Sequence, residues 1–180
     1  MTTDYIFIAA AYLDVAKADA DYVSERLRHD GVSTDACDCV ILGRKSSGEV
    51  RLYRGLDLGQ PTPYADEPTS RLAAGLALAL FPSIGADIPA SRVREREALS
   101  AVAGVVAGAL GREDLYELGA LLDVLSAGLI AATTPSAEER VRSALTHADA
   151  SMSRSVSVDL DAIERAVGLI AARHRPRAAE

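Results

Sequence analysis

Two short apolar segments, residues 72–81 and 99–110, most constrain what this chain can fold into. Both are rich in alanine and glycine, and a charged link bounded by prolines separates them. Each falls well short of the roughly 20 apolar residues that a membrane-spanning helix needs. The two segments therefore predict a helical hairpin, over residues 69–110, that packs against other protein.

The second segment places Ser100, Gly104 and Gly108 four residues apart. This spacing puts small residues on one helix face, where they allow another helix to approach closely. A small sheet already served by three other helices is expected to leave the apolar faces of the hairpin uncovered, and such patches mark interfaces. The sequence thus predicts a homo-oligomer whose interface includes Leu72, Leu76, Leu80, Ser100, Val102, Gly104, Val106 and Gly108.

The composition restricts the classes of partner. The chain has 180 residues, enough for a single domain with a hydrophobic core. Its net charge of −7 opposes binding to nucleic-acid phosphates and to anionic lipid surfaces. Aromatic residues make up only 4%, with no tryptophan, so stacking on nucleic-acid bases is disfavoured. We therefore expect no nucleic-acid partner.

Hydrophobic periodicity and turn residues predict the order of secondary structure. The expected strands cover residues 5–13, 36–42, 50–56, 128–132 and 154–158, and the expected helices cover 16–29, 69–81, 91–110, 112–125, 136–148 and 159–173. This order favours the α+β class, as a ferredoxin-like split βαβ sheet. In this interpretation one domain comprises a core of residues 4–58 and 111–150, the inserted hairpin 69–110 and a C-terminal strand–helix extension 151–180.

Three stretches carry a resemblance to a known family: residues 3–14, residues 65–80 with Asp66-Glu67-Pro68-Thr69 leading into Gly75, and residues 111–130. They resemble a bacterial family of unknown function whose members are commonly labelled predicted membrane or stress-associated proteins. The resemblance implies fold and self-association rather than a reaction. The charged residues 92–97 between the two apolar segments depart from the more glycine-rich family pattern, and they oppose membrane insertion.

Residues able to support chemistry are few and scattered. His29, His147 and His174 lie far apart in the sequence, so exposed surface roles are favoured over a metal site. Cys37 and Cys39 are expected to be buried thiols, because a spacing of two residues is poor disulfide geometry.

Ser153, Ser155 and Ser157 alternate along an expected strand, but no nucleophile-elbow motif surrounds them. The sequence consequently predicts no catalytic, metal or cofactor site.

The leading functional interpretation is a non-enzymatic, self-assembling cytoplasmic protein, and the family resemblance implies a stress-associated role. The cytoplasmic assignment follows from the absence of a signal-type apolar core near Met1. One alternative is a peripheral membrane-associated protein. The other is a small-ligand-binding or catalytic dimeric α+β barrel, in which Tyr53 and either Arg51 or Arg54 would point into a pocket.

Overall fold

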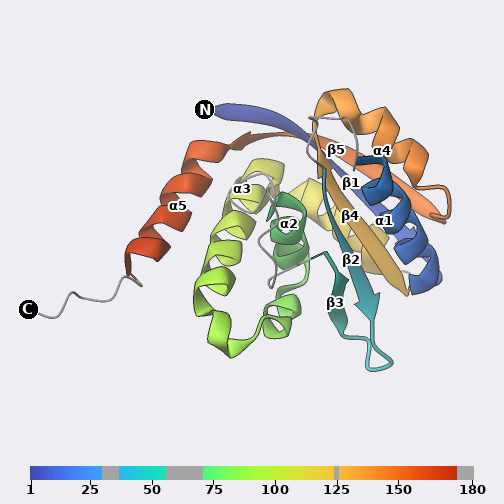
Figure 1. Cartoon of the computed structure of the whole chain (residues 1–180), viewed down its shortest axis with the longest axis horizontal. Coiled ribbons are helices and arrows are strands. Elements are labelled where there is room, and N and C mark those ends of the chain that lie inside the picture. Colours follow the sequence, from blue (N-terminus) through green and yellow to red (C-terminus); the bar gives the residue numbers. More distant parts are fainter. Residues whose placement is uncertain (30–36, 56–70, 124–125, 174–180) are drawn as a thin grey trace, which may run out of the picture.

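The computed structural model describes residues 1–29, 37–55, 71–123 and 126–173, which form a five-stranded antiparallel sheet with helices on both faces (Figure 1). The α+β class predicted from the sequence is confirmed, and each expected strand overlaps an observed one. The elements are β1 (Thr2–Tyr12), α1 (Val15–His29), β2 (Asp38–Arg44), β3 (Val50–Arg54), α2 (Leu72–Leu80), α3 (Val93–Asp123), β4 (Ala127–Thr133), α4 (Glu138–Ala144), β5 (Ala150–Asp159) and α5 (Leu160–Arg173), with short 3-10 helices at Pro82–Asp87, Ala90–Arg92 and Pro135–Ala137.

The strand order is β3-β2-β4-β1-β5. β4 therefore lies between β1 and β2, and β1 lies between β4 and β5, so the units β1-α1-β2 and β4-α4-β5 interleave. The helix of the second unit is α4. The helix expected from the sequence over residues 112–125 belongs to neither unit, because residues 112–123 form the second half of α3 and contribute Leu118 and Leu122 to the core on the hairpin side.

The helices divide between the two faces of the sheet: α1 and α4 cover one face, and α2, α3 and α5 cover the other (Figure 1). Alternate residues of β1 serve the two cores. Ile6 and Ile8 belong to the cluster with α1, whereas Phe7 and Ala9 belong to the cluster with the hairpin. This two-sided burial explains why β1 is a nearly continuous apolar run.

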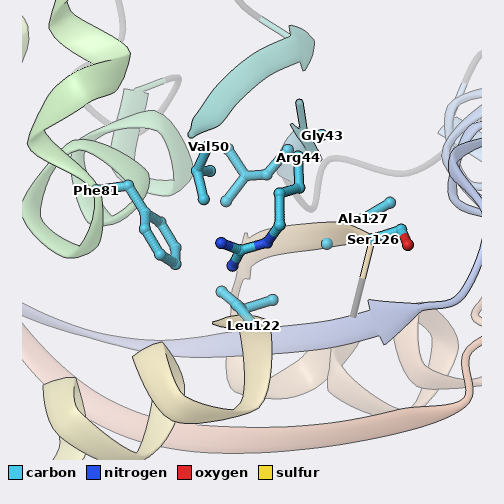
Figure 2. Close-up of a pocket in the computed structure, with 9 residues that line it drawn as sticks. Gly43, Arg44, Val50, Phe81, Leu122, Ser126 and Ala127 are labelled. Atoms are coloured by element: carbon cyan, nitrogen blue, oxygen red, sulfur yellow. The ribbon is translucent and has the colours of Figure 1, made fainter. Parts of the chain in front are cut away.

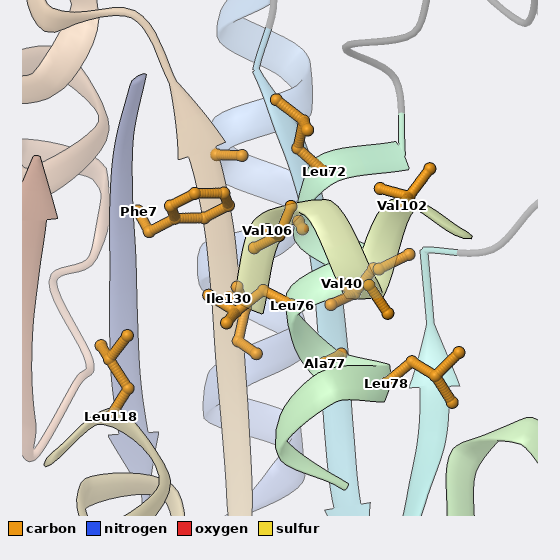
Figure 3. Packing of buried hydrophobic residues seen from close by; sticks show 14 of the residues in the cluster. Phe7, Val40, Leu72, Leu76, Ala77, Leu78, Val102, Val106, Leu118 and Ile130 are labelled. Atoms are coloured by element: carbon orange, nitrogen blue, oxygen red, sulfur yellow. The ribbon is translucent and has the colours of Figure 1, made fainter. Parts of the chain in front are cut away.

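The hairpin packs on the sheet of its own chain (Figure 3). Leu72, Leu76, Val102 and Val106, expected from the sequence at an interface between copies, have at most 1% of their surface exposed within a single chain. The expectation that the apolar helix faces of the hairpin lie uncovered is wrong. Because α1 and α4 pack on one face of the sheet, the other face is free to pack against the hairpin. Among the described residues, no helix combines the length and apolar character needed to cross a membrane.

Helices α2 and α3 approach each other closely at Gly75, whereas the four-residue spacing predicted a close helix approach at Gly104 and Gly108. A Cβ atom added to Gly75 of α2 would lie 2.5 Å from Val102 Cγ1, so the absence of a side chain lets α2 and α3 meet. Ser100, Gly104 and Gly108 face solvent, and a Cβ on either of these glycines would meet no atom within 4 Å. Leu80 is partly buried.

The segment that follows β4 is shorter than expected. The sequence predicts a helix over residues 136–148, but Ser136 lies in the 3-10 helix and α4 ends at Ala144. The next five residues return the chain to the sheet, where Asp149 N–H donates to the Ala11 carbonyl (3.0 Å) and Asp149 Oδ2 accepts from Leu13 N–H (2.9 Å).

Candidate functional site

A surface groove of about 460 Å³ lies at the edge of the sheet where β1 and β2 end and β4 begins. These ends meet because β1 and β2 both run antiparallel to β4. The lining comes from four separate stretches of the chain: Leu13, Asp14, Val15, Gly43, Arg44, Lys45, Arg51, Leu52, Tyr53 and Ser126.

Arg44 supports the wall of this groove. Its guanidinium donates to the carbonyls of Gly48 (2.7 Å) and Asp123 (3.1 Å), and it forms an ion pair with the Asp123 carboxylate. The side chain turns toward Phe81 and Leu122, beside a cavity of only about 10 Å³ (Figure 2). These contacts commit Arg44 to joining the β2 end to α3.

Arg51 is held in a fixed orientation. Its Nη1 donates to Asp87 Oδ1 (2.7 Å), while Asp87 Oδ2 accepts from Leu52 N–H (2.9 Å), so one carboxylate clamps both side chain and backbone of β3. Glu49 Oε2 lies 3.3 Å from Arg51 Nε. Arg51 also lines the groove, where it lies beside Leu52 and Tyr53.

Lys45 and two apolar side chains give the groove its amphipathic character. Lys45 is exposed, and the described residues place no carboxylate in an ion pair with it. Leu13 and Tyr53 are 61% and 57% exposed, and both line the groove. The groove thus offers an apolar platform beside one lysine and one preoriented arginine.

The ligand-pocket hypothesis from the sequence named Arg51, Tyr53 and Arg54. Arg51 and Tyr53 do line the groove. Arg54 instead forms an ion pair with Asp19 and lies over the Tyr22 ring, 5.5 Å from its centroid. The three side chains therefore separate into two in the groove and one tying β3 to α1.

A second polar cluster centres on Asp21, a fully buried carboxylate on α1. Asp21 Oδ2 accepts from Tyr12 O–H and from His147 N–H, each at 3.0 Å. Asp21 Oδ1 lies 2.6 Å from His147 Nδ1 and 3.4 Å from Thr146 Oγ1. Burial, followed by the nearby Asp21 charge, raises the pKa of Tyr12, so its phenol stays protonated and donates to Asp21.

The Asp21 carboxylate fixes the ring of His147. A carboxylate oxygen accepts hydrogen bonds, so Nδ1 is the donor in the contact with Asp21 Oδ1. The His147 side chain is 51% exposed, whereas the Asp21 side chain is buried. The sequence placed His147 in the helix expected over residues 136–148. It could not reveal the contact with Asp21, because Asp21 lies 126 positions earlier and no local motif links the two.

The remaining sequence candidates are dispersed. Ser155 and Ser157 are exposed, and Ser153 donates to Glu138 Oε1 (3.0 Å). His29 has an undescribed side chain, and His174 lies outside the described residues. A search of the described residues finds no group of three or more His, Cys, Asp or Glu side chains placed to hold a metal ion.

Comparison with protein-family models found no matching family, and neither the curated proteins nor the solved structures contained a match.

Proposed function

We propose that this domain binds a small anionic amphipathic molecule in the surface groove where β1 and β2 end. We call this part of the sheet the β1–β2 edge. The observation that carries the proposal is the juxtaposition of two exposed apolar side chains, Leu13 and Tyr53, with Lys45 and the clamped Arg51. The apolar part of the ligand would cover Leu13 and Tyr53. Its anionic end would bind Lys45 and Arg51.

The volume and the lining of the groove support this proposal. Small-molecule sites commonly enclose about 300–1,000 Å³ and combine apolar lining with a few placed polar groups. Asp14, the acidic lining residue, uses Oδ1 to accept from Ala16 N–H (2.9 Å) at the start of α1. The clamp on Arg51 lowers the entropy that binding must remove, since its guanidinium is already oriented.

The strand topology supports a finer fold proposal, that the sheet is a ferredoxin-like split βαβ sheet. Interleaved β1-α1-β2 and β4-α4-β5 units are the arrangement that this fold requires. The hairpin and α5 cover the sheet face that a dimeric barrel would pair, so we propose a binding site within one chain.

Octanoate is a suitable probe, because it joins one carboxylate to one apolar chain. We expect saturable binding by isothermal titration calorimetry, weakened about tenfold by Lys45→Gln or Arg51→Gln, the size expected for one charged contact. Lys17→Gln is the matched control, since it removes the same charge from an exposed site on α1 outside the groove. Equal binding of octylammonium, or equal weakening by Lys17→Gln, would refute the proposal.

A second proposal is self-assembly through the outer face of α3, which keeps part of the interface expected from the sequence. The supporting observation is that Ser100, Gly104 and Gly108 are exposed beside one another on successive turns. A second helix could approach this face without steric conflict, because the space beside both glycines is open.

Light scattering of the purified chain at micromolar concentration tests assembly. We expect a dimer or larger species, converted to monomer by Gly104→Leu, with folding retained because the new side chain points into open space. A wild-type monomer would exclude this second proposal and leave the ligand proposal unaffected.

A further inference from the structure

We propose that Cys37 and Cys39 form a hydroperoxide-reactive dithiol that closes to an intramolecular disulfide. Their Sγ atoms lie 3.4 Å apart at the start of β2. A disulfide requires about 2.05 Å, so the two sulfur atoms would have to approach by a further ~1.4 Å. This site is separate from the groove, whose β2 residues, Gly43 and Arg44, come from the other end of the strand.

The position on the strand permits this approach. An extended strand rises about 3.3 Å per residue, which would hold alternate Cα atoms near the upper limit for a disulfide. Cys37, however, precedes the first residue of β2, so the strand does not fix its backbone. Pairing of β2 with β3 starts only at Ile41, and Cys39 is aligned with Ala131 of β4.

The two thiols differ in exposure in a way that suits sequential roles. Cys37 is half-buried and therefore reachable by a small peroxide, whereas Cys39 is only 9% exposed. The Cys37 thiol releases its proton, and the thiolate attacks the terminal oxygen of the hydroperoxide. The O–O bond breaks, Cys37 sulfenic acid forms, and the leaving alkoxide takes up the released proton and departs as an alcohol, or as water when the oxidant is hydrogen peroxide. Cys39 sulfur then attacks the Cys37 sulfur, and the sulfenic oxygen leaves as water with the thiol proton. The dithiol loses two electrons and the peroxide gains two.

The residue between the cysteines connects this reaction to the hairpin. Asp38 Oδ2 accepts from Ala73 N–H (2.8 Å) and so holds the start of α2. Drawing Cys37 and Cys39 together moves the Asp38 backbone that lies between them. We therefore expect faster amide exchange at Ala73 after oxidation.

The test is treatment of the native chain with hydrogen peroxide, followed by alkylation and intact mass analysis. We expect loss of both thiols together, a mass decrease of two hydrogens per chain, and full reversal by a dithiol reductant. In Cys39→Ser the sulfenic acid at Cys37 should persist and be trapped by dimedone, whereas Cys37→Ser should react more slowly.

The same chain unfolded in urea is the matched control, because it keeps the sequence spacing but loses the folded positioning. Disulfide formation should be slower there. The proposal is wrong if the unfolded chain closes as fast as the native one, if single oxidised thiols accumulate in the wild type, or if the product is a disulfide between chains.

Discussion

The helical hairpin and the β1–β2 edge of the sheet use their side chains in opposite ways. The hairpin is the most conspicuous part of the sequence, yet its large residues are absorbed into the core, with Leu72 and Leu76 fully buried. The groove at the β1–β2 edge is lined by residues that form no motif in the sequence, and it leaves Leu13 and Tyr53 exposed to solvent. Apolar runs therefore locate the core of this chain, whereas topology creates its candidate site.

The strongest test of this contrast truncates one leucine in each region. Leu76→Ala should lower the free energy of unfolding by about 2–5 kcal/mol, because it empties a buried site between α2 and the sheet. Leu13→Ala should change it by no more than about 0.5 kcal/mol. Urea denaturation measures both values, and similar losses in the two variants would remove the distinction.

Within the hairpin, a sharper test adds a methyl group where the helices are closest. Gly75→Ala should destabilise the fold by about 1–3 kcal/mol, since its Cβ would overlap Val102 Cγ1. The double variant with Val102→Ala should show a coupling that recovers part of this loss, because the obstructing atom is then gone. A Gly75→Ala protein as stable as the wild type would mean that α2 and α3 do not meet here.

The stability of the chain should depend on pH through Asp38, which joins the hairpin to the sheet. Burial raises the pKa of Asp38 to about 8, although Ala73 N–H donates to the carboxylate and opposes the shift. The folded chain then holds a proton that the unfolded chain releases near pH 4, so stability should fall as pH rises between about 4 and 8 and level off above.

Asp38→Asn removes this titration. The difference in unfolding free energy between variant and wild type should shift in favour of the variant across that pH window. Parallel stability curves for the two proteins would show that Asp38 titrates normally.

Substitutions on the outer face of α3 should have the smallest effect on the free energy of unfolding. They should stabilise the fold, whereas Gly75→Ala should destabilise it. Gly104→Ala and Gly108→Ala should each raise the free energy of unfolding by about 0.5–1 kcal/mol, because alanine favours the helix and its Cβ meets no neighbour. Thermal melts of dilute protein provide the measurement. Destabilisation of the monomeric chain by either change would mean that the space beside these glycines is not open.

Much of the fold follows from local sequence, for reasons that these residues illustrate. Alternation and apolar runs locate the strands, Gly111 marks the helix break through its positive φ of 82°, and Asp159 caps α5 by accepting from Ala162 N–H at 3.1 Å. Each of these signals acts over a few neighbouring residues. Local patterns consequently sufficed for the elements and the α+β class.

Which face of a helix is packed depends on distant partners, and here the local pattern misled. The spacing of Gly104 and Gly108 resembles a packing face, but only the placement of the sheet shows that Gly75 provides the close approach. The Asp21–His147 pair likewise joins α1 to the turn after α4, across 126 positions. Arg51 and Tyr53 could be named from the sequence because β3 was recognised, whereas Leu13 and Lys45 required the strand order.

The most direct test of the account is an octanoate titration followed by backbone amide chemical shifts. If the edge is the functional region and the hairpin is core, the shifts should concentrate at Leu13, Lys45, Arg51, Tyr53 and Ser126, while α2 and the outer face of α3 stay unchanged. Shifts confined to the hairpin, or an absence of shifts at saturating octanoate, would contradict the account.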